Sequence, residues 1–260
     1  KLTEDLKNQI LKGTNQQEIE DLYLPYKKRF QTLGTKAREK GLEPLSKLIL
    51  DGIISDEDFE PSLVEPFISE EKEVETIEEA LSGAVDIIAE DFAYEPENRE
   101  LVRPHIDKSA NLNCHVDEDL LTSEEPLKDK DGKEVDIQNF ETYFNFEMHH
   151  NKIQNHQILA IQRAEALDVV AVEFSTPDEN IIHELKKLHN ISHNLYYEDA
   201  VEKGYKRYME RTLKRELWHS MKEKAYEHAI QVFATNLKNL LLTPPVKGSA
   251  IIGIDPGYRT

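Results

Sequence analysis

Residues 209–242 read MERTLKRELWHSMKEKAYEHAIQVFATNLKNLLL, and this stretch decides the fold class of the chain. An apolar side chain recurs at every fourth position within it, at Met209, Leu213, Leu217, Met221, Ala225, Ala229, Phe233, Leu237 and Leu241. Positions four apart lie on nearly the same side of an α-helix, so the pattern predicts a long amphipathic helix. We expect the whole stripe to be buried in a helical core, within a helical region over residues 198–242 that forms one or two pieces.

Local signals elsewhere also favour helices. Capping boxes at residues 14–17 and 76–79 predict two helix starts, and Gly41 followed by Pro44 separates two helices within residues 36–51. Prolines 96 and 104 bracket a shorter helix, and Thr176 with Pro177 begins another. The β-branched run at residues 169–174 suits a short strand. Residues 115–139 are polar and acidic, which predicts a weakly ordered connection with one short helix.

Charge is distributed unevenly along the chain. The 260 residues carry a formal net charge of −19, which argues against a general nucleic-acid-binding surface. Acids dominate residues 56–79, whereas basic residues dominate residues 27–40 and 203–215. This segregation fits either solvated helix faces or selected faces that bind a polyanion. The candidate nucleic-acid-binding residues are Lys27, Lys28, Arg29, Lys36, Arg38, Lys206, Arg207, Arg211, Lys214 and Arg215.

Composition and spacing bound the remaining chemistry. No apolar run approaches the roughly 20 residues that a membrane-spanning helix needs. The single Cys114 rules out an internal disulfide framework and fits a reducing compartment. The chain has ten histidines, but no cluster has the spacing of a zinc motif, and there is no phosphate loop or serine elbow. We therefore predict neither a metal site nor a cofactor.

The last ten residues, IIGIDPGYRT, form an apolar run that enters an Asp-Pro-Gly turn. A buried strand needs partners on both edges, and none follow. Because the first residue is also not methionine, we expect an interior piece of a longer protein. Asp255 lies where nucleases with an RNase-H-like fold place a metal-binding acid, but two cations need several acids. The alternative is an aspartate that only caps the turn after its strand.

Several blocks of the chain, taken in order, resemble the Tex family of bacterial transcription accessory proteins. They are residues 21–27 (DLYLPYK), 35–45 (TKAREKGLEPL), 82–90 (SGAVDIIAE), 156–165 (HQILAIQRAE), 234–242 (ATNLKNLLL), Pro244-Pro245, and 253–260 (GIDPGYRT). Two features depart from the family pattern. Ala164 stands where the family usually has glycine, and uncharged residues such as Phe30 and Gln31 stand where relatives often carry more basic ones.

The resemblance implies a mainly α fold over residues 1–247. This region would be an irregular multi-helix layer with a helix-turn-helix-like part and a short β element. Residues 248–260 would be the first strand of a truncated YqgF-type, RNase-H-like α/β domain. In the family that domain generally lacks a complete nuclease site, so Asp255 would be a relic rather than a catalyst. RNA would be bound chiefly by an OB-fold domain absent here, in the cytoplasm, or in the nucleus of a eukaryote.

Three functional hypotheses follow. The first is a non-catalytic scaffold and nucleic-acid-binding portion of a Tex-like transcription factor, with contacts to the transcription machinery and none to membranes. The second is a protein-interaction module that recruits a basic partner through the acidic residues 56–79. The third is part of a metal-dependent nuclease that uses Asp255.

Overall fold

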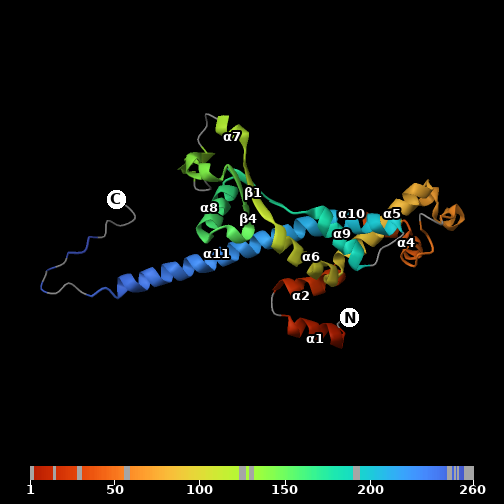
Figure 1. Ribbon diagram of the computed structural model, residues 1–260, viewed down its shortest axis with the longest axis horizontal. Coiled ribbons are helices and arrows are strands. Elements are labelled where there is room, and N and C mark those ends of the chain that lie inside the picture. The colour runs from red at the N-terminus through yellow and green to blue at the C-terminus, as the bar shows by residue number, and fades with distance from the viewer. Residues whose placement is uncertain are drawn as a thin grey trace.

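The computed structural model describes residues 3–13, 16–27, 31–55, 59–122, 127–128, 132–189, 194–244, 248, 250 and 252–254. Within these ranges the chain is mainly α-helical, which confirms the predicted fold class (Figure 1). The α-helices are α1 (Glu4–Lys12), α2 (Gln16–Tyr23), α3 (Leu33–Glu39), α4 (Glu43–Leu50), α5 (Ile77–Tyr94), α6 (Pro96–Ser109), α7 (Glu118–Thr122), α8 (Asn155–Ala166), α9 (Asp178–Leu188), α10 (Leu195–Gly204) and α11 (Glu210–Leu241).

Short turns and strands complete the described secondary structure. The 3₁₀ turns are η1 (Leu24–Tyr26), η2 (Pro61–Leu63), η3 (Glu65–Phe67), η4 (Glu70–Lys72), η5 (Ile137–Tyr143) and η6 (His150–Lys152). A π-helical segment, η7 (Tyr205–Met209), joins α10 to α11. The strands are β1 (Asn111–Val116), β2 (Leu127–Lys128), β3 (Glu134–Val135), β4 (Asn145–His149) and β5 (Val170–Ser175).

Helix α5 is the centre of the first helical layer, because α3, α4 and α10 all pack against it. Small residues allow close approach. A Cβ at Gly204 of α10 would lie 2.8 Å from the carbonyl oxygen of Ala89, and one at Gly34 of α3 would meet the side chain of Glu90. Gly41, in the left-handed region at φ +82°, separates α3 from α4 as predicted.

Two core clusters continue from this layer. One joins the end of α5 to α6, α9 and the α10–α11 junction, with the fully buried Tyr205 near its centre. The Tyr205 hydroxyl donates a hydrogen bond to the carboxylate of Asp178 (2.5 Å) at the start of α9. The other cluster lies between a small sheet, α8 and the first half of α11.

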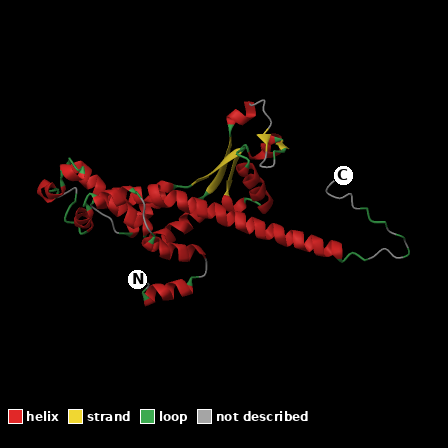
Figure 2. Ribbon diagram, turned by 180° about the vertical axis from the view of Figure 1, so that it is seen from behind, coloured by secondary structure: helices red, strands yellow, loops and turns green. Residues whose placement is uncertain are grey.

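The sheet is antiparallel with strand order β4-β1-β5, and it lies beside α8 and above α11 (Figure 2). Of the three strands of this sheet, only β5 was predicted. Strand β1 reads NLNCHV, in which the buried Leu112 and Cys114 alternate with polar residues. This period of two is typical of a strand with one buried face, but three of its six residues, Asn111, Asn113 and His115, are polar, which hides it from a search for apolar runs.

Helix α11 corrects the prediction for its second half. From Met209 to Ala225 the stripe is buried, apart from the partly buried Leu217. Its start packs with α6 and α9, and the part near Met221 packs with the sheet and α8. Beyond that point α11 projects away from the described body of the chain (Figure 1). Phe233 is 67% exposed, and Leu237 and Leu241 are 41% and 73% exposed. The four-residue repeat specifies which side of the helix is apolar, but burial also requires an element to pack there.

Two boundaries differ from the predictions, and a third lies partly outside the described residues. Helix α6 does not end at Pro104 but continues to Ser109. The ring removes only the bond to the carbonyl of Glu100, an exposed residue whose carbonyl can be solvated instead. Thr176 does not cap α9, since its hydroxyl donates to Asp178 (2.6 Å) and the helix starts at Asp178. The capping box at residues 14–17 includes 14–15, which lie outside the described residues.

Residues 115–139 contain more local structure than one short helix. They hold the end of β1, the predicted helix as α7, the β2–β3 pair and the start of η5. In contrast, the described residues of the expected terminal strand, Ile252 to Ile254, are in no strand, and both isoleucines are 86% exposed. A single extended segment gains ladder hydrogen bonds only when a partner strand lies beside it. Among the described helices, none combines the length and the apolar character of a membrane-spanning segment.

Candidate functional site

The first predicted basic patch is only partly available to a ligand. Lys27 and Lys36 are exposed, the latter on α3. Arg38 instead forms ion pairs with the buried Glu90 and with Asp91 (both 2.5 Å), which bind α3 to α5. Lys28 and Arg29 lie outside the described residues. Arg38 therefore has a structural role rather than a free guanidinium.

Among the described residues, the second predicted patch likewise contains both ion-paired and unpaired basic residues. Lys206 pairs with Glu202 (2.6 Å), Arg207 pairs with Asp86 of α5 (2.7 Å), and Lys214 pairs with Glu210 (2.7 Å). By contrast, Arg211 and Arg215 are exposed on α11. Within the described part of the chain neither has an ion-pair partner.

Arg211 and Arg215 line a cavity of about 920 Å³ between β5 and α11, which we call the β5–α11 cavity. Its lining residues are Glu165, Val172, Glu173, Phe174, Glu210, Arg211, Lys214, Arg215, Trp218 and Lys222. Trp218 is fixed in place, because its indole N–H donates to Glu165 of α8 (2.8 Å) and its ring lies 6.3 Å from that of Phe174. Lys222 lies over the Trp218 ring, 5.1 Å from its centroid.

The cavity combines a cationic side with an apolar floor. Four of its ten lining residues are basic and three are acidic. Two of the acids already have a partner, because Glu165 accepts from Trp218 and Glu210 accepts from Lys214. Sequence reasoning missed Lys222 and Trp218. Their spacing from Arg211 and Arg215 (residues 211, 215, 218 and 222 at steps of three or four) would have placed all four on one helix side.

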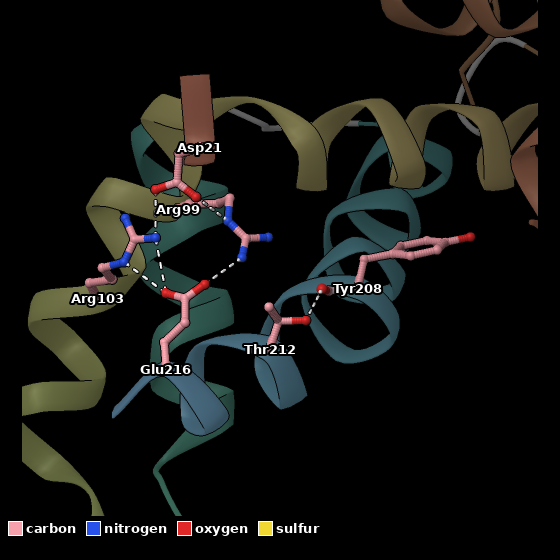
Figure 3. Close-up of polar contacts among 6 residues, drawn as sticks. All are labelled: Asp21, Arg99, Arg103, Tyr208, Thr212 and Glu216. Atoms are coloured by element: carbon pink, nitrogen blue, oxygen red, sulfur yellow. Dashed lines mark hydrogen bonds and ion pairs between the residues drawn. The ribbon is translucent and has the colours of Figure 1, made fainter. Parts of the chain in front are cut away.

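An ion-pair network joins α2, α6 and α11 on another side of α11 (Figure 3). Arg99 donates to Asp21 (2.9 Å) and to Glu216 (3.1 Å). Arg103 pairs with the same two carboxylates, at 2.5 Å and 3.0 Å. Asp21 belongs to the block 21–27 that carries the family resemblance, and this network gives that aspartate a structural reason to be present.

Burial and the neighbouring charges have opposite effects on the pKa values of this network. Arg99 and Asp21 are 4% and 5% exposed. Burial raises the pKa of the Asp21 carboxyl above its ordinary value, although Arg103 and Arg99 both lower it. Burial alone would lower the pKa of Arg103, but Asp21 and Glu216 raise it above its ordinary value. Two carboxylates and two guanidinium groups thus neutralise each other, and the network holds helices together rather than presenting charge.

A second cavity, of about 360 Å³, lies between α6 and α11 next to this network. Its lining includes Arg103 and Glu216, together with apolar side chains such as Ile106 and Leu213. Arg103 and Glu216 are already paired with each other, and the third charged lining residue, Asp107, lies 3.6 Å from His150. This smaller cavity therefore offers little unpaired polarity to orient a ligand.

Candidate reactive groups give no catalytic arrangement among the described residues. Asp255 lies outside them. Burial raises the pKa of the Cys114 thiol to about 12, so it is neutral and a poor nucleophile near pH 7. His149 and His150 stack on each other and bond to backbone carbonyls of α6. No group of three or more potential metal ligands comes together within the described ranges.

The acidic region is partly described, since residues 56–58 lie outside. Acidic residues from Glu60 to Glu79 are exposed on the η2–η4 turns and the start of α5. Lys40 approaches Glu73 at 3.8 Å, at the edge of this region. The region therefore presents negative charge to solvent, but the described residues give no further sign of a ligand there.

Comparison with known proteins places the chain among relatives. A family model described as Tex central region-like matches residues 58–233. The "Uncharacterized protein YdcI" of Bacillus subtilis is 37% identical over 264 residues, covering 100% of this chain and 35% of that protein. "Protein tex" of Bordetella pertussis is 31% identical over 280 residues (100% and 33%). The human "S1 RNA-binding domain-containing protein 1" is 27% identical over 276 residues (100% and 26%). The chain thus spans about a third or less of the length of these relatives.

Proposed function

The chain belongs to the Tex family, and from this premise we propose that it is a non-catalytic scaffold within a transcription accessory factor. The relative from Neisseria gonorrhoeae is named "Transcriptional accessory protein Tex". One observation carries the scaffold role: α11 is buried in the core over its first half and projects with exposed apolar side chains over its second. Such a helix can hold a neighbouring domain in a fixed position relative to the core of this chain.

The projecting half has the side-chain pattern of a packing surface. Tyr226, Ile230, Phe233, Leu237 and Leu240 recur at alternating steps of four and three. All five are more than 40% exposed. Exposed apolar surface of this extent usually marks a contact with another protein part. In the scaffold proposal this part is the RNase-H-like domain that the family resemblance implies beyond residue 248.

Hydrogen exchange tests the scaffold proposal. The amides of residues 226–241 should exchange faster in the 260-residue chain than the aligned amides do in the full-length Bacillus subtilis relative. In the longer protein a packed domain would protect them. Residues 213–225 serve as the internal control, because they are packed in the chain itself and should be slow in both proteins. Equal exchange of the projecting half in the two proteins would remove the scaffold role.

Nucleic-acid binding by this chain itself is a second candidate function. It is favoured by the exposed Lys27 and Lys36 and by the RNA-binding domain in the name of the human relative. The net charge of −19 opposes it, so binding would be non-specific and confined to one face. Such phosphate contacts release counterions, and affinity should fall steeply as salt rises.

The salt dependence of binding to single-stranded RNA tests this second function. Replacing Lys27 and Lys36 with glutamine should lower the slope of log affinity against log salt by about 1.4, at roughly 0.7 per phosphate contact. The exposed Lys187 of α9, changed to glutamine, is the control and should leave the slope unchanged. A slope that does not respond to the double substitution would exclude this patch.

The nuclease alternative has a direct test. We expect the full-length protein with Mg²⁺ to leave nucleic acid intact, because the proposed function is non-catalytic. Cleavage that is abolished by Asp255→Asn would establish the nuclease instead.

A further inference from the structure

The β5–α11 cavity meets β5 along its edge. Three successive residues of the strand, Val172, Glu173 and Phe174, line it. Successive side chains of a strand point to opposite faces, so all three can line one cavity only if that cavity runs along the strand edge. Strand order β4-β1-β5 leaves this edge without a second strand among the described residues. Backbone N–H and C=O groups on such an edge can pair with another chain.

We propose that the β5–α11 cavity binds an extended acidic peptide segment of a protein partner, which adds to the sheet as a fourth strand beside β5. Backbone hydrogen bonds to the β5 edge would supply affinity that does not depend on sequence. Side chains at alternate positions of the peptide would supply specificity through the cavity wall and floor.

The spacing of the unpaired cations fits a strand. Arg211 and Arg215 are one helical turn apart, which separates them by about 6 Å along the α11 axis. On a strand, side chains two positions apart lie on the same face and are about 6.6 Å from each other. Two carboxylates at alternate positions of the peptide can therefore face the two guanidinium groups at once. Guanidinium groups also bind carboxylates in a two-pronged manner.

The apolar floor sets the other requirement on the peptide. Val172 and Phe174 belong to the core-facing side of β5, since they pair in register with the buried Cys114 and Leu112. With Trp218 they form an aromatic and β-branched surface within the cavity. An apolar side chain of the bound strand can pack on this surface, as cross-strand neighbours do.

A peptide fits these groups better than a nucleic acid does. The lining carboxylates Glu165, Glu173 and Glu210 repel a continuous row of phosphates, whereas a peptide places its charges only at chosen positions. A nucleic acid also gains nothing from the free strand edge. The overall charge of −19 does not prevent binding, because fields from distant acids are screened beyond about 8 Å at physiological salt.

Fluorescence anisotropy on the full 260-residue chain tests the proposal. The probe is a short, capped, fluorescein-labelled peptide in which two glutamates and a valine occupy successive alternate positions, with threonine between them. All three side chains then lie on one face of the bound strand. Charge reversal by Arg211→Glu with Arg215→Glu should weaken its binding by about tenfold or more, because two ion pairs become two repulsions. The control reverses two charges on the same helix outside the cavity, by Lys224→Glu with Lys238→Glu, and should bind like the unchanged chain.

A second arm separates strand addition from simple charge attraction. The same peptide, methylated on every second backbone nitrogen along the pairing edge, keeps its charges but cannot donate to β5. It should bind about tenfold more weakly, and the unmodified peptide should slow hydrogen exchange of the β5 amides. Equal binding of the methylated peptide would overturn the proposal. So would an equal loss of binding in the control variant.

A third arm uses a single-stranded oligothymidylate as probe. The proposal expects its binding to be no more sensitive to the Arg211 and Arg215 reversal than to the control reversal. If instead the oligonucleotide binds through these two arginines and the peptide does not bind, the cavity is a nucleic-acid site and the peptide assignment is wrong. The scaffold proposal stands or falls separately, because it depends on residues 226–241.

Discussion

Single residues decide how closely the helices of the first layer approach. Gly204 and Gly83 both lie at helix contacts, yet their neighbours differ. A Cβ at Gly204 would meet the backbone carbonyl of Ala89, whereas one at Gly83 would meet the end of the Leu42 side chain. Backbone cannot move without shifting a whole helix, but a leucine side chain can change its rotamer at small cost. Identical residue types thus make different contributions to stability.

Gly204→Ala should lower the free energy of unfolding by about 1 to 3 kcal/mol, the usual cost of overpacking a well-packed contact. The gain in helix propensity, at most about 1 kcal/mol, only partly offsets this cost. Gly83→Ala is the matched comparison and should be less destabilising. Urea unfolding followed by circular dichroism measures both. A Gly204→Ala chain as stable as the unchanged one would contradict the close approach of α10 to α5.

His189, at the end of α9, predicts a pH dependence. Its Nε2–H donates to the side-chain oxygen Oδ1 of Asn98 (2.6 Å), because the Asn98 side-chain nitrogen Nδ2 already donates to the backbone carbonyl of Phe92 (2.8 Å). Burial lowers the pKa of His189 below its ordinary value of 6.5. The unfolded chain therefore binds this proton more readily than the folded chain does. The resulting stability is present above pH 6.5 and is lost as the pH falls through 6.5 towards the folded-state pKa.

Urea midpoints measured between pH 7.5 and pH 5 test this assignment. The midpoint should fall with pH, and His189→Gln should make the fall shallower, since glutamine does not titrate. The change should be modest because His189 as a whole residue is exposed to solvent, which limits the effect of burial on its ring. The exposed His183, replaced in the same way, is the control. An unchanged pH profile in the His189 variant would show that other groups cause the fall.

At the scale of elements, α11 shows how one sequence pattern can have two structural outcomes. The apolar repeat has the same spacing on both sides of Ala225. On the near side α6, α9, the sheet and α8 cover it, whereas on the far side no described element does. The hydrophobic effect stabilises only the surface that is removed from water, so the two halves contribute very differently to the stability of this chain.

Leucine-to-alanine substitutions at the two ends of α11 test this difference. Leu213→Ala, at a residue 3% exposed, should cost about 2 to 5 kcal/mol of unfolding free energy. Leu240→Ala, at a residue 71% exposed, should change it by less than about 0.5 kcal/mol. Chemical denaturation measures both. A comparable loss at Leu240 would mean that the second half of α11 is packed against something within the chain.

At the scale of the whole molecule, the Asp21 network connects parts that are far apart in sequence. Arg99 is 78 residues from Asp21 and 117 residues from Glu216 along the chain. The N-terminal helix α2 is thereby held against α6 and α11, away from the three apolar clusters. A buried network of this kind adds little net free energy when complete, but it is costly to break.

Arg99→Met should therefore destabilise the chain by about 3 to 5 kcal/mol, because the buried Asp21 and the partly buried Glu216 are left with only one cation. Adding Asp21→Leu to this variant should recover part of the loss. Lys47→Met, which removes the exposed pair with Glu43, is the control and should cost less than about 1 kcal/mol. A double-mutant cycle in urea gives the coupling. Strictly additive costs would show that the four groups do not act together.

The sequence alone determined the helical class, the start of α4 after Gly41, the run at β5 and the family. These features depend on local geometry and on the order of residues, and both can be read directly from the sequence. It also indicated two basic patches, but not which of their cations were free. Arg38 and Arg207 are ion-paired with distant acids, and no local pattern reveals an acid that lies 52 or 121 residues away.

Only the tertiary structure decided which surfaces are covered. It placed half of the α11 stripe in the core and left the other half exposed. It also brought the β5 edge beside Arg211 and Arg215, which no sequence spacing connects. The physical reason is the same in each case. Burial, desolvation and charge pairing each depend on two groups that come together, and only folding brings the second group beside the first.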